Sequence, residues 1–141
     1  MTSRAAVFPT IALAFACSSA FAAPETAPHA AACVAALEAQ ETTLAETVKG
    51  GEPVQPELLK VVRSGIAIIG TQYLAGLREA EARQMLKAAQ HDFQTLPPGA
   101  AAERQAQCLK EGEALFEHAS AIERSLITSA AQRRIRRVTA A

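Results

Sequence analysis

The sequence contains no tryptophan and one tyrosine, and aromatic residues make up 4% of its 141 residues. Asparagine is also absent. A core without large rings must be built from alanine, leucine, isoleucine and valine, which places helices at close spacing. Such a core leaves little volume for an internal ligand, and we therefore expect no enclosed cofactor pocket.

The sequence also lacks the pattern of a β-strand, because no segment alternates apolar and polar residues with a two-residue period. Its most frequent residues include alanine, leucine, glutamate, arginine and glutamine, which are strong helix formers. The length is sufficient for one domain. The composition therefore predicts a single all-α domain.

No charge of one sign dominates the chain. Fourteen lysine and arginine residues balance fourteen aspartate and glutamate residues, so the formal net charge is zero at pH 7. A protein without a global positive field has no electrostatic signature of nucleic-acid binding. We expect no nucleic-acid partner.

Motifs for catalysis and cofactor binding are missing as well. His29, His91 and His118 are scattered and lack the spacings typical of zinc, covalent haem or di-iron sites. No nucleophile motif and no phosphate-binding glycine loop is present. We expect no enzyme activity, no metal and no cofactor. The least favoured hypothesis is a catalytic or cofactor role for His118 and nearby glutamates.

Residues 1–22 have the features of a secretory signal peptide. Arg4 supplies the positive charge, an apolar stretch follows it, and a small-x-small cleavage site ends at Ala22. The apolar stretch is shorter than the roughly 20 residues of a membrane span. We therefore predict an exported protein, periplasmic or secreted. The alternative is a lipoprotein acylated at Cys17, but the residues before Cys17 match a lipobox poorly.

The mature domain is then 23–141, with a short mobile leader at 23–27. Removal of Cys17 leaves Cys33 and Cys108, an even pair in an oxidising compartment. The alternative is a redox or metal role for the pair, which we disfavour because the chain has no Cys-x-x-Cys motif and we expect no histidine near either cysteine. The sequence therefore predicts one structural Cys33–Cys108 disulfide.

Hydrophobic periodicity predicts an up-down bundle of three long helices. The first spans about 28–49 and ends at Gly50 and Gly51, with Glu38 and Glu41 facing outward. The second spans 56–96 and is the most apolar, so we place it centrally. A slip in its pattern indicates either a kink or a split near Gly76, and a split gives a separate helix at 79–95.

The third predicted helix spans 100–138 and carries the most regular apolar pattern. Its apolar residues follow alternating steps of four and three, a coiled-coil seam. Gly112 lies in this seam and either marks a close helix contact or is simply tolerated. The seam weakens after Leu126, so we expect the C-terminal end to fray or overhang. The expected seam positions are Cys108, Gly112, Leu115, Ala119, Ile122, Leu126 and Ser129.

A basic cluster ends this predicted helix. One interpretation is a solvated C-terminus, where cations complement the helix dipole. The other is a contact with an anionic surface, such as lipid headgroups. The cluster comprises Arg133, Arg134, Arg136 and Arg137.

The sequence favours a non-catalytic binding protein over an enzyme. We expect a small exported helical module that interacts with a protein partner in the cell envelope or acts in a chaperone-like way. The alternative is a peripheral membrane-surface binder that uses the arginine cluster. The oligomeric state does not follow from the sequence.

Overall fold

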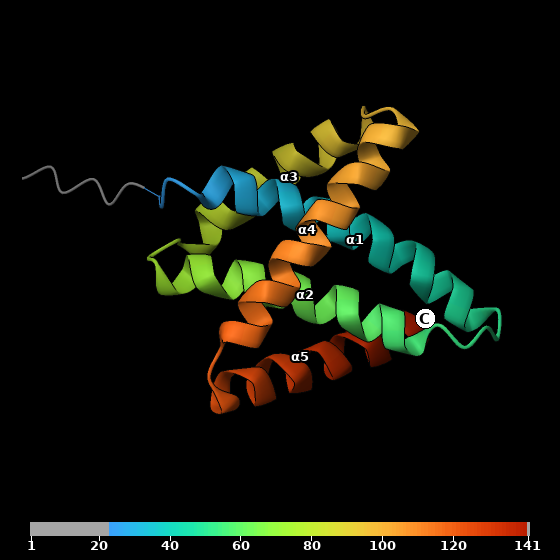
Figure 1. The fold of residues 1–141 in the computed structure, drawn as a ribbon. Helices are drawn as coiled ribbons and strands as arrows, with labels where there is room; N and C mark the ends of the chain where they lie inside the picture. Colours follow the sequence, from blue (N-terminus) through green and yellow to red (C-terminus); the bar gives the residue numbers. More distant parts are fainter. Residues whose placement is uncertain (1–22, 141) are drawn as a thin grey trace, which may run out of the picture.

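The computed structural model describes residues 23–140, which form five helices and no strand (Figure 1). The all-α prediction is confirmed. The predicted signal peptide and Cys17 lie outside the described residues. The helices are α1 (Ala27–Lys49), α2 (Gln55–Leu74), α3 (Glu79–Gln94), α4 (Pro98–His118) and α5 (Ala121–Ala140).

The helices do not form the predicted up-down bundle of three. α1 and α2 form an antiparallel hairpin, and α4 passes across both of them (Figure 1). α3 packs against α1, while α5 runs antiparallel to α2 along its length (Figure 1). α2 contacts α1, α4 and α5, whereas α1 contacts all four other helices, so the predicted apolar segment shares the central position with α1.

The first predicted helix is confirmed, and a glycine ends it as expected. Gly51 adopts a positive φ of 91°. Its N–H donates to the Val48 carbonyl and the Glu52 N–H donates to the Thr47 carbonyl. This pair of hydrogen bonds is a Schellman motif, which satisfies carbonyls left free at a helix end.

The second predicted helix is split at Gly76, and a continuous helix over 56–96 is wrong. Gly76 has a φ of 100°, a conformation that glycine adopts without steric cost. The Leu77 N–H donates to the Gln72 carbonyl and the Gly76 N–H to the Tyr73 carbonyl, which forms a second Schellman motif. Buried Leu77 holds the turn against the core. The separate helix considered at 79–95 is therefore present as α3.

The third predicted helix is also broken, so the continuous helix over 100–138 is wrong. Ala119 is extended, with φ −66° and ψ 151°. The Ser120 N–H donates to Glu123 Oε2 at 2.7 Å, and the Glu123 N–H donates to Ser120 Oγ at 3.2 Å. These reciprocal bonds are a capping box that starts α5. Hydrogen bonding to the Ser120 side chain, and then to its N–H, lowers the pKa of Glu123.

The break redirects the chain and changes which residues are buried. Ala131 is fully buried, and Ile135 and Val138 pack with it against a cluster that contains Leu58 of α2. The predicted frayed C-terminus is therefore wrong, because α5 folds back along α2. The predicted seam also fails beyond α4, since Ile122 and Leu126 are 74% and 64% exposed.

The remaining core lies where α1, α2 and α4 meet. Gly112 of α4 faces Ser64 of α2, and a Cβ at position 112 would lie 2.5 Å from the Ser64 Cβ. Gly112 therefore marks a close helix–helix contact. This was one of the two interpretations of Gly112 that the sequence allowed. The buried cluster around this crossing comprises Ala30, Cys33, Val34, Leu37, Val61, Ile68 and Cys108.

Candidate functional site

The predicted disulfide joins α1 to α4. Cys33 Sγ and Cys108 Sγ are bonded, and their Cα atoms lie 5.1 Å apart. Both residues are buried. The bridge closes a loop of 75 residues, for which chain entropy alone corresponds to roughly 4–4.5 kcal/mol. The bond therefore fixes the crossing of α1 and α4.

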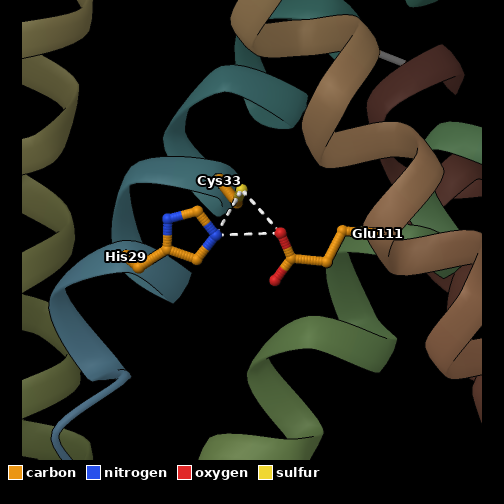
Figure 2. Close-up of side chains that lie close together, drawn as sticks. All are labelled: His29, Cys33 and Glu111. Atoms are coloured by element: carbon orange, nitrogen blue, oxygen red, sulfur yellow. Dashed lines mark hydrogen bonds and ion pairs between the residues drawn. The ribbon is translucent and has the colours of Figure 1, made fainter.

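Two polar side chains lie beside Cys33 of this disulfide (Figure 2). His29 Nε2 lies 2.8 Å from Glu111 Oε2. Cys33 Sγ lies 3.8 Å from His29 Nε2 and 3.9 Å from Glu111 Oε2. The interpretation that no histidine lies near either cysteine is wrong, because His29 lies one helical turn before Cys33 and its ring contacts Cys33 Sγ. While the disulfide is closed, however, Cys33 offers no thiolate.

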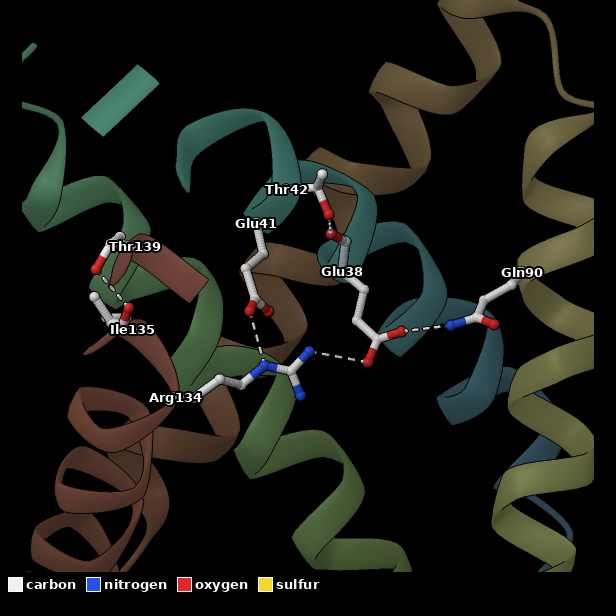
Figure 3. Close-up of polar contacts among 7 residues, drawn as sticks. All are labelled: Glu38, Glu41, Thr42, Gln90, Arg134, Ile135 and Thr139. Carbon is white, nitrogen blue, oxygen red and sulfur yellow. Dashed lines mark hydrogen bonds and ion pairs between the residues drawn. The ribbon is translucent and has the colours of Figure 1, made fainter. Parts of the chain in front are cut away.

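Arg134 is half-buried and bonded to two glutamates, unlike its exposed neighbours in the arginine cluster. Its Nε donates to Glu41 Oε1 at 2.8 Å and its Nη2 donates to Glu38 Oε1 at 3.1 Å (Figure 3). The Glu41 side chain is only 7% exposed, so its predicted outward position is wrong. Burial alone lowers the pKa of Arg134, but the hydrogen bonds and charges of Glu41 and Glu38 outweigh it and raise the pKa.

This network also ties α3 to α1. Glu38 Oε2 accepts a hydrogen bond from Gln90 Nε2 at 2.8 Å (Figure 3). A cavity of about 490 Å³ lies beside the network and is bounded by α1, α3 and α5. Arg134 thus joins α5 to α1, and Glu38 extends the network to α3, whereas Arg133, Arg136 and Arg137 are exposed.

An apolar groove lies on another face, between α2, α4 and α5. It has a volume of about 390 Å³. Leu74 and Tyr73 line it from α2, Leu115 from α4, and Leu126 from α5. Leu74 is 83% exposed, although its position in the predicted central helix suggested burial. The polar groups Thr71 and Glu123 also line this groove.

Exposed large apolar residues gather at this groove. Within the described part of the chain, those residues are Tyr73, Leu74, Ile122 and Leu126. Three of them line the groove, and Ile122 lies one turn before Leu126 on α5. Exposed apolar residues scattered singly are ordinary, but a contiguous patch indicates an interaction surface.

The outer face of α5 combines this apolar patch with the free arginines. Successive residues turn by about 100° around a helix axis, so Ile122, Leu126 and Arg133 lie on one line. Arg136 and Arg137 flank that line toward the C-terminus. All five residues are exposed. This face is apolar in its first half and basic in its second half.

The other histidines do not join a polar cluster with the cysteines. The ring Nδ1–H of His118 donates to the Ala114 carbonyl at 2.7 Å, within its own helix. His91 is exposed on α3. The described chain therefore groups one histidine with Cys33, and the spacing His29-x-x-x-Cys33 is the sequence signal that predicts this grouping.

None of the helices described between residues 23 and 140 combines the length and the apolarity needed to cross a membrane. The chain matches no protein-family model, no curated protein and no solved structure in the three comparisons made.

Proposed function

We propose that this protein is an exported, non-catalytic binding module that holds apolar polypeptide segments in the groove between α2, α4 and α5. One observation carries the proposal: the large apolar side chains exposed on the described surface gather at this groove. Surfaces of this kind lose unfavourable contact with water when a partner covers them.

A polypeptide segment fits this site better than a small molecule does. A small ligand usually has most of its surface buried in a concave pocket. Here Leu74 and Leu126 stand out at 83% and 64% exposure, and Ile122 extends the patch beyond the groove. A partner must therefore cover protruding side chains as well as fill a hollow, as an apolar helix or extended segment can.

Suppression of aggregation tests the chaperone-like form of this proposal. A cysteine-free client protein is denatured by heat, and its light scattering is followed with and without the folded protein. We expect the wild type to suppress scattering, and Leu74→Glu and Leu126→Glu to abolish the effect because a carboxylate in the groove must be desolvated. Ala106→Glu, at an exposed position of α4 outside the groove, is the matched control. Equal suppression by wild type and Leu126→Glu contradicts the proposal.

A second candidate function is binding to an anionic membrane surface through the outer face of α5. The observation that favours it is the line of Ile122, Leu126 and Arg133, continued by Arg136 and Arg137. Apolar residues can enter the headgroup region while arginines pair with phosphates. Arg134 is excluded from this surface by its bonds to Glu41 and Glu38.

Flotation with lipid vesicles tests this second candidate. The triple variant Arg133→Ala, Arg136→Ala and Arg137→Ala removes the free cations and leaves Arg134 in place. We expect the wild type to float with phosphatidylglycerol vesicles but not with phosphatidylcholine vesicles, and the triple variant to stay unbound. Arg104→Ala, which changes an exposed arginine of α4, is the control. Equal flotation of the triple variant removes this candidate.

Export is part of the proposal and rests on the features of residues 1–22. A chain carrying this segment is expressed in a bacterium, and the mass of the protein in the envelope fraction is measured. The proposal expects a mature chain that begins at Ala23. An uncleaved chain in the cytoplasm contradicts it.

A further inference from the structure

The disulfide and the two polar side chains beside it come from two pairs of residues, one pair on each of two helices. His29 and Cys33 are four residues apart on α1, and Cys108 and Glu111 are three residues apart on α4. Residues at these spacings lie on one face of a helix. The two faces meet where α4 crosses α1, so a nitrogen, an oxygen and the Cys33 sulfur are brought together (Figure 2). The Cys108 sulfur is bonded to the Cys33 sulfur.

We propose that reduction of the disulfide converts this group into a binding site for one zinc-like divalent cation. The ligands are Cys33 Sγ, Cys108 Sγ, His29 Nε2 and one carboxylate oxygen of Glu111. The disulfide and the metal complex are alternative states of the same four residues. This inference is independent of the apolar groove, which lies elsewhere on the molecule.

The donor set matches the chemistry of zinc. Thiolate, imidazole and carboxylate are its usual ligands, and four of them in a tetrahedron are typical of structural sites. Softer thiolates also select zinc over magnesium and calcium, which prefer oxygen. Metal sites in helical bundles are likewise built from inward-facing side chains on neighbouring helices.

The distances from Cys33 already approach those of a tetrahedral site, whereas the two sulfur atoms, which are bonded to each other in the oxidised state, must move apart to hold a cation between them. Zinc–ligand bonds of about 2.0–2.3 Å place neighbouring ligand atoms roughly 3.3–3.8 Å apart. Cys33 Sγ already lies 3.8 Å from His29 Nε2 and 3.9 Å from Glu111 Oε2. The 2.8 Å between His29 Nε2 and Glu111 Oε2 must widen by about half an ångström, because a shared proton is replaced by the cation.

The site has a buried side and an open side. Cys33 and Cys108 are 0% and 1% exposed. The side chains of His29 and Glu111 are 54% and 38% exposed. The cation therefore has an entry path through the polar pair, and the sulfurs are shielded from bulk solvent once it is bound.

The chemistry balances with a named reductant. A dithiol transfers two electrons and two protons to the Cys33–Cys108 bond, which yields two thiols while the dithiol becomes a cyclic disulfide. The cation then replaces the two thiol protons, which pass to solvent, and binds both thiolates. Oxidation of the thiolates by a disulfide reverses the sequence and releases the cation.

Cobalt(II) alone is the probe, because its thiolate complexes absorb in the near ultraviolet and its tetrahedral complexes absorb in the visible. The purified protein is reduced with a water-soluble phosphine, which binds metal weakly, and the phosphine is removed before titration. We expect both absorptions to saturate at one cobalt per chain. The oxidised protein should show neither, and added zinc should displace the cobalt.

Ligand variants separate a built site from simple thiol binding. His29→Ala and Glu111→Gln should each weaken cobalt binding by about tenfold or more, since loss of even an outer partner commonly has such an effect. His91→Ala and Glu117→Gln are matched controls at exposed positions and should bind as the wild type does. Unchanged affinity in His29→Ala and Glu111→Gln would overturn the proposal.

Reduction of the disulfide could also lower the helix content of the protein, and circular dichroism measures this change. In that case we expect one equivalent of cobalt or zinc to restore the helical signal of the reduced wild type, but not that of His29→Ala at the same concentration. A reduced wild-type protein that neither binds cobalt with a thiolate absorption nor regains helix with metal contradicts the proposal.

Discussion

Gly112 of α4 lies directly against Ser64 of α2, with no room for a side chain between the two helices. A Cβ at position 112 would lie 2.5 Å from the Ser64 Cβ and 2.8 Å from its Cα. Because backbone cannot move aside as a flexible side chain can, Gly112→Ala must push the helices apart. Overpacking of this kind commonly costs about 1–3 kcal/mol. We predict that chemical denaturation shows this loss.

Gly65→Ala is the matched control for this prediction. It directly follows Ser64 in α2, and a Cβ there meets nothing within 4 Å. Alanine in a helix interior is favoured over glycine by roughly 0.5–1 kcal/mol, so this variant should be slightly more stable than the wild type. If both variants behave alike, the close crossing of α2 and α4 is wrong.

The disulfide should account for much of the protein's net stability. We predict that Cys33→Ala with Cys108→Ala lowers the free energy of unfolding by about 4 kcal/mol, the entropy of the released 75-residue loop. The measurement is denaturant unfolding of the two proteins at one pH. Mass spectrometry is the check: the unreduced wild type should be lighter than its reduced form by two hydrogen atoms. Equal masses contradict the bridge.

Arg134 should matter to stability more than its exposed neighbours do. Arg134→Met leaves the carboxylate of Glu41 buried without its partner, and loss of a hydrogen bond to a buried charged group costs about 1.5–3 kcal/mol. Arg133→Met, an exposed control, should change the free energy of unfolding by less than about 0.5 kcal/mol. The double variant Arg134→Met with Glu41→Leu should recover much of the loss, because the buried Glu41 charge is removed together with its partner. Additive losses in the double variant contradict this pairing.

The capping box at the start of α5 should make the free energy of unfolding depend on pH in the acidic range. Hydrogen bonding to Ser120 lowers the pKa of Glu123 in the folded state. A carboxyl with a lowered folded pKa contributes stability that is complete above its unfolded pKa and is lost as the pH falls through its folded pKa. We predict that Glu123→Gln removes this part of the pH profile of unfolding. If the free energy of unfolding of Glu123→Gln varies with pH as that of the wild type does, the capping box is refuted.

Ser120→Ala tests the same box without changing charge. It removes the hydroxyl that accepts the Glu123 N–H, and loss of a serine N-cap typically costs about 1 kcal/mol. Ser125→Ala, at an exposed position within α5, is the control and should have little effect. Amide exchange should quicken first in the turn that follows Ser120. No difference between the two variants argues against a helix start at this position.

Local signals in the sequence predicted the helices but not all of their ends. Gly51 and Gly76 end helices through backbone conformations that glycine favours, and both positions stand out in the sequence. Ser120 and Glu123 have the spacing of a capping box, yet the apolar seam continues across them by chance. Because the apolar pattern continues across residues 119 and 120, the sequence predicted one long helix over 100–138, although the helix breaks there.

The sites depend on contacts between distant residues, which local patterns do not contain. Glu41 looked like a solvated residue because its partner, Arg134, lies 93 positions away. Leu74 and Leu126 belonged to the apolar patterns of the predicted second and third helices. The turn at Gly76, after Leu74, and the break at Ala119, before Leu126, place both side chains at the surface. The disulfide was predictable because two cysteines allow a single pairing, whereas the position of Glu111 beside it required the crossing of α4 over α1.

Chemical-shift mapping tests the proposed binding function most directly. An amphipathic helical peptide with a leucine face is added to protein with isotope-labelled methyl groups. We predict that the methyl resonances of Leu74, Leu126 and Ile127 at the groove shift and saturate, while those of buried Leu58 and Val62 stay in place. Shifts confined to another face, or no shifts at all, would contradict the groove as the binding site.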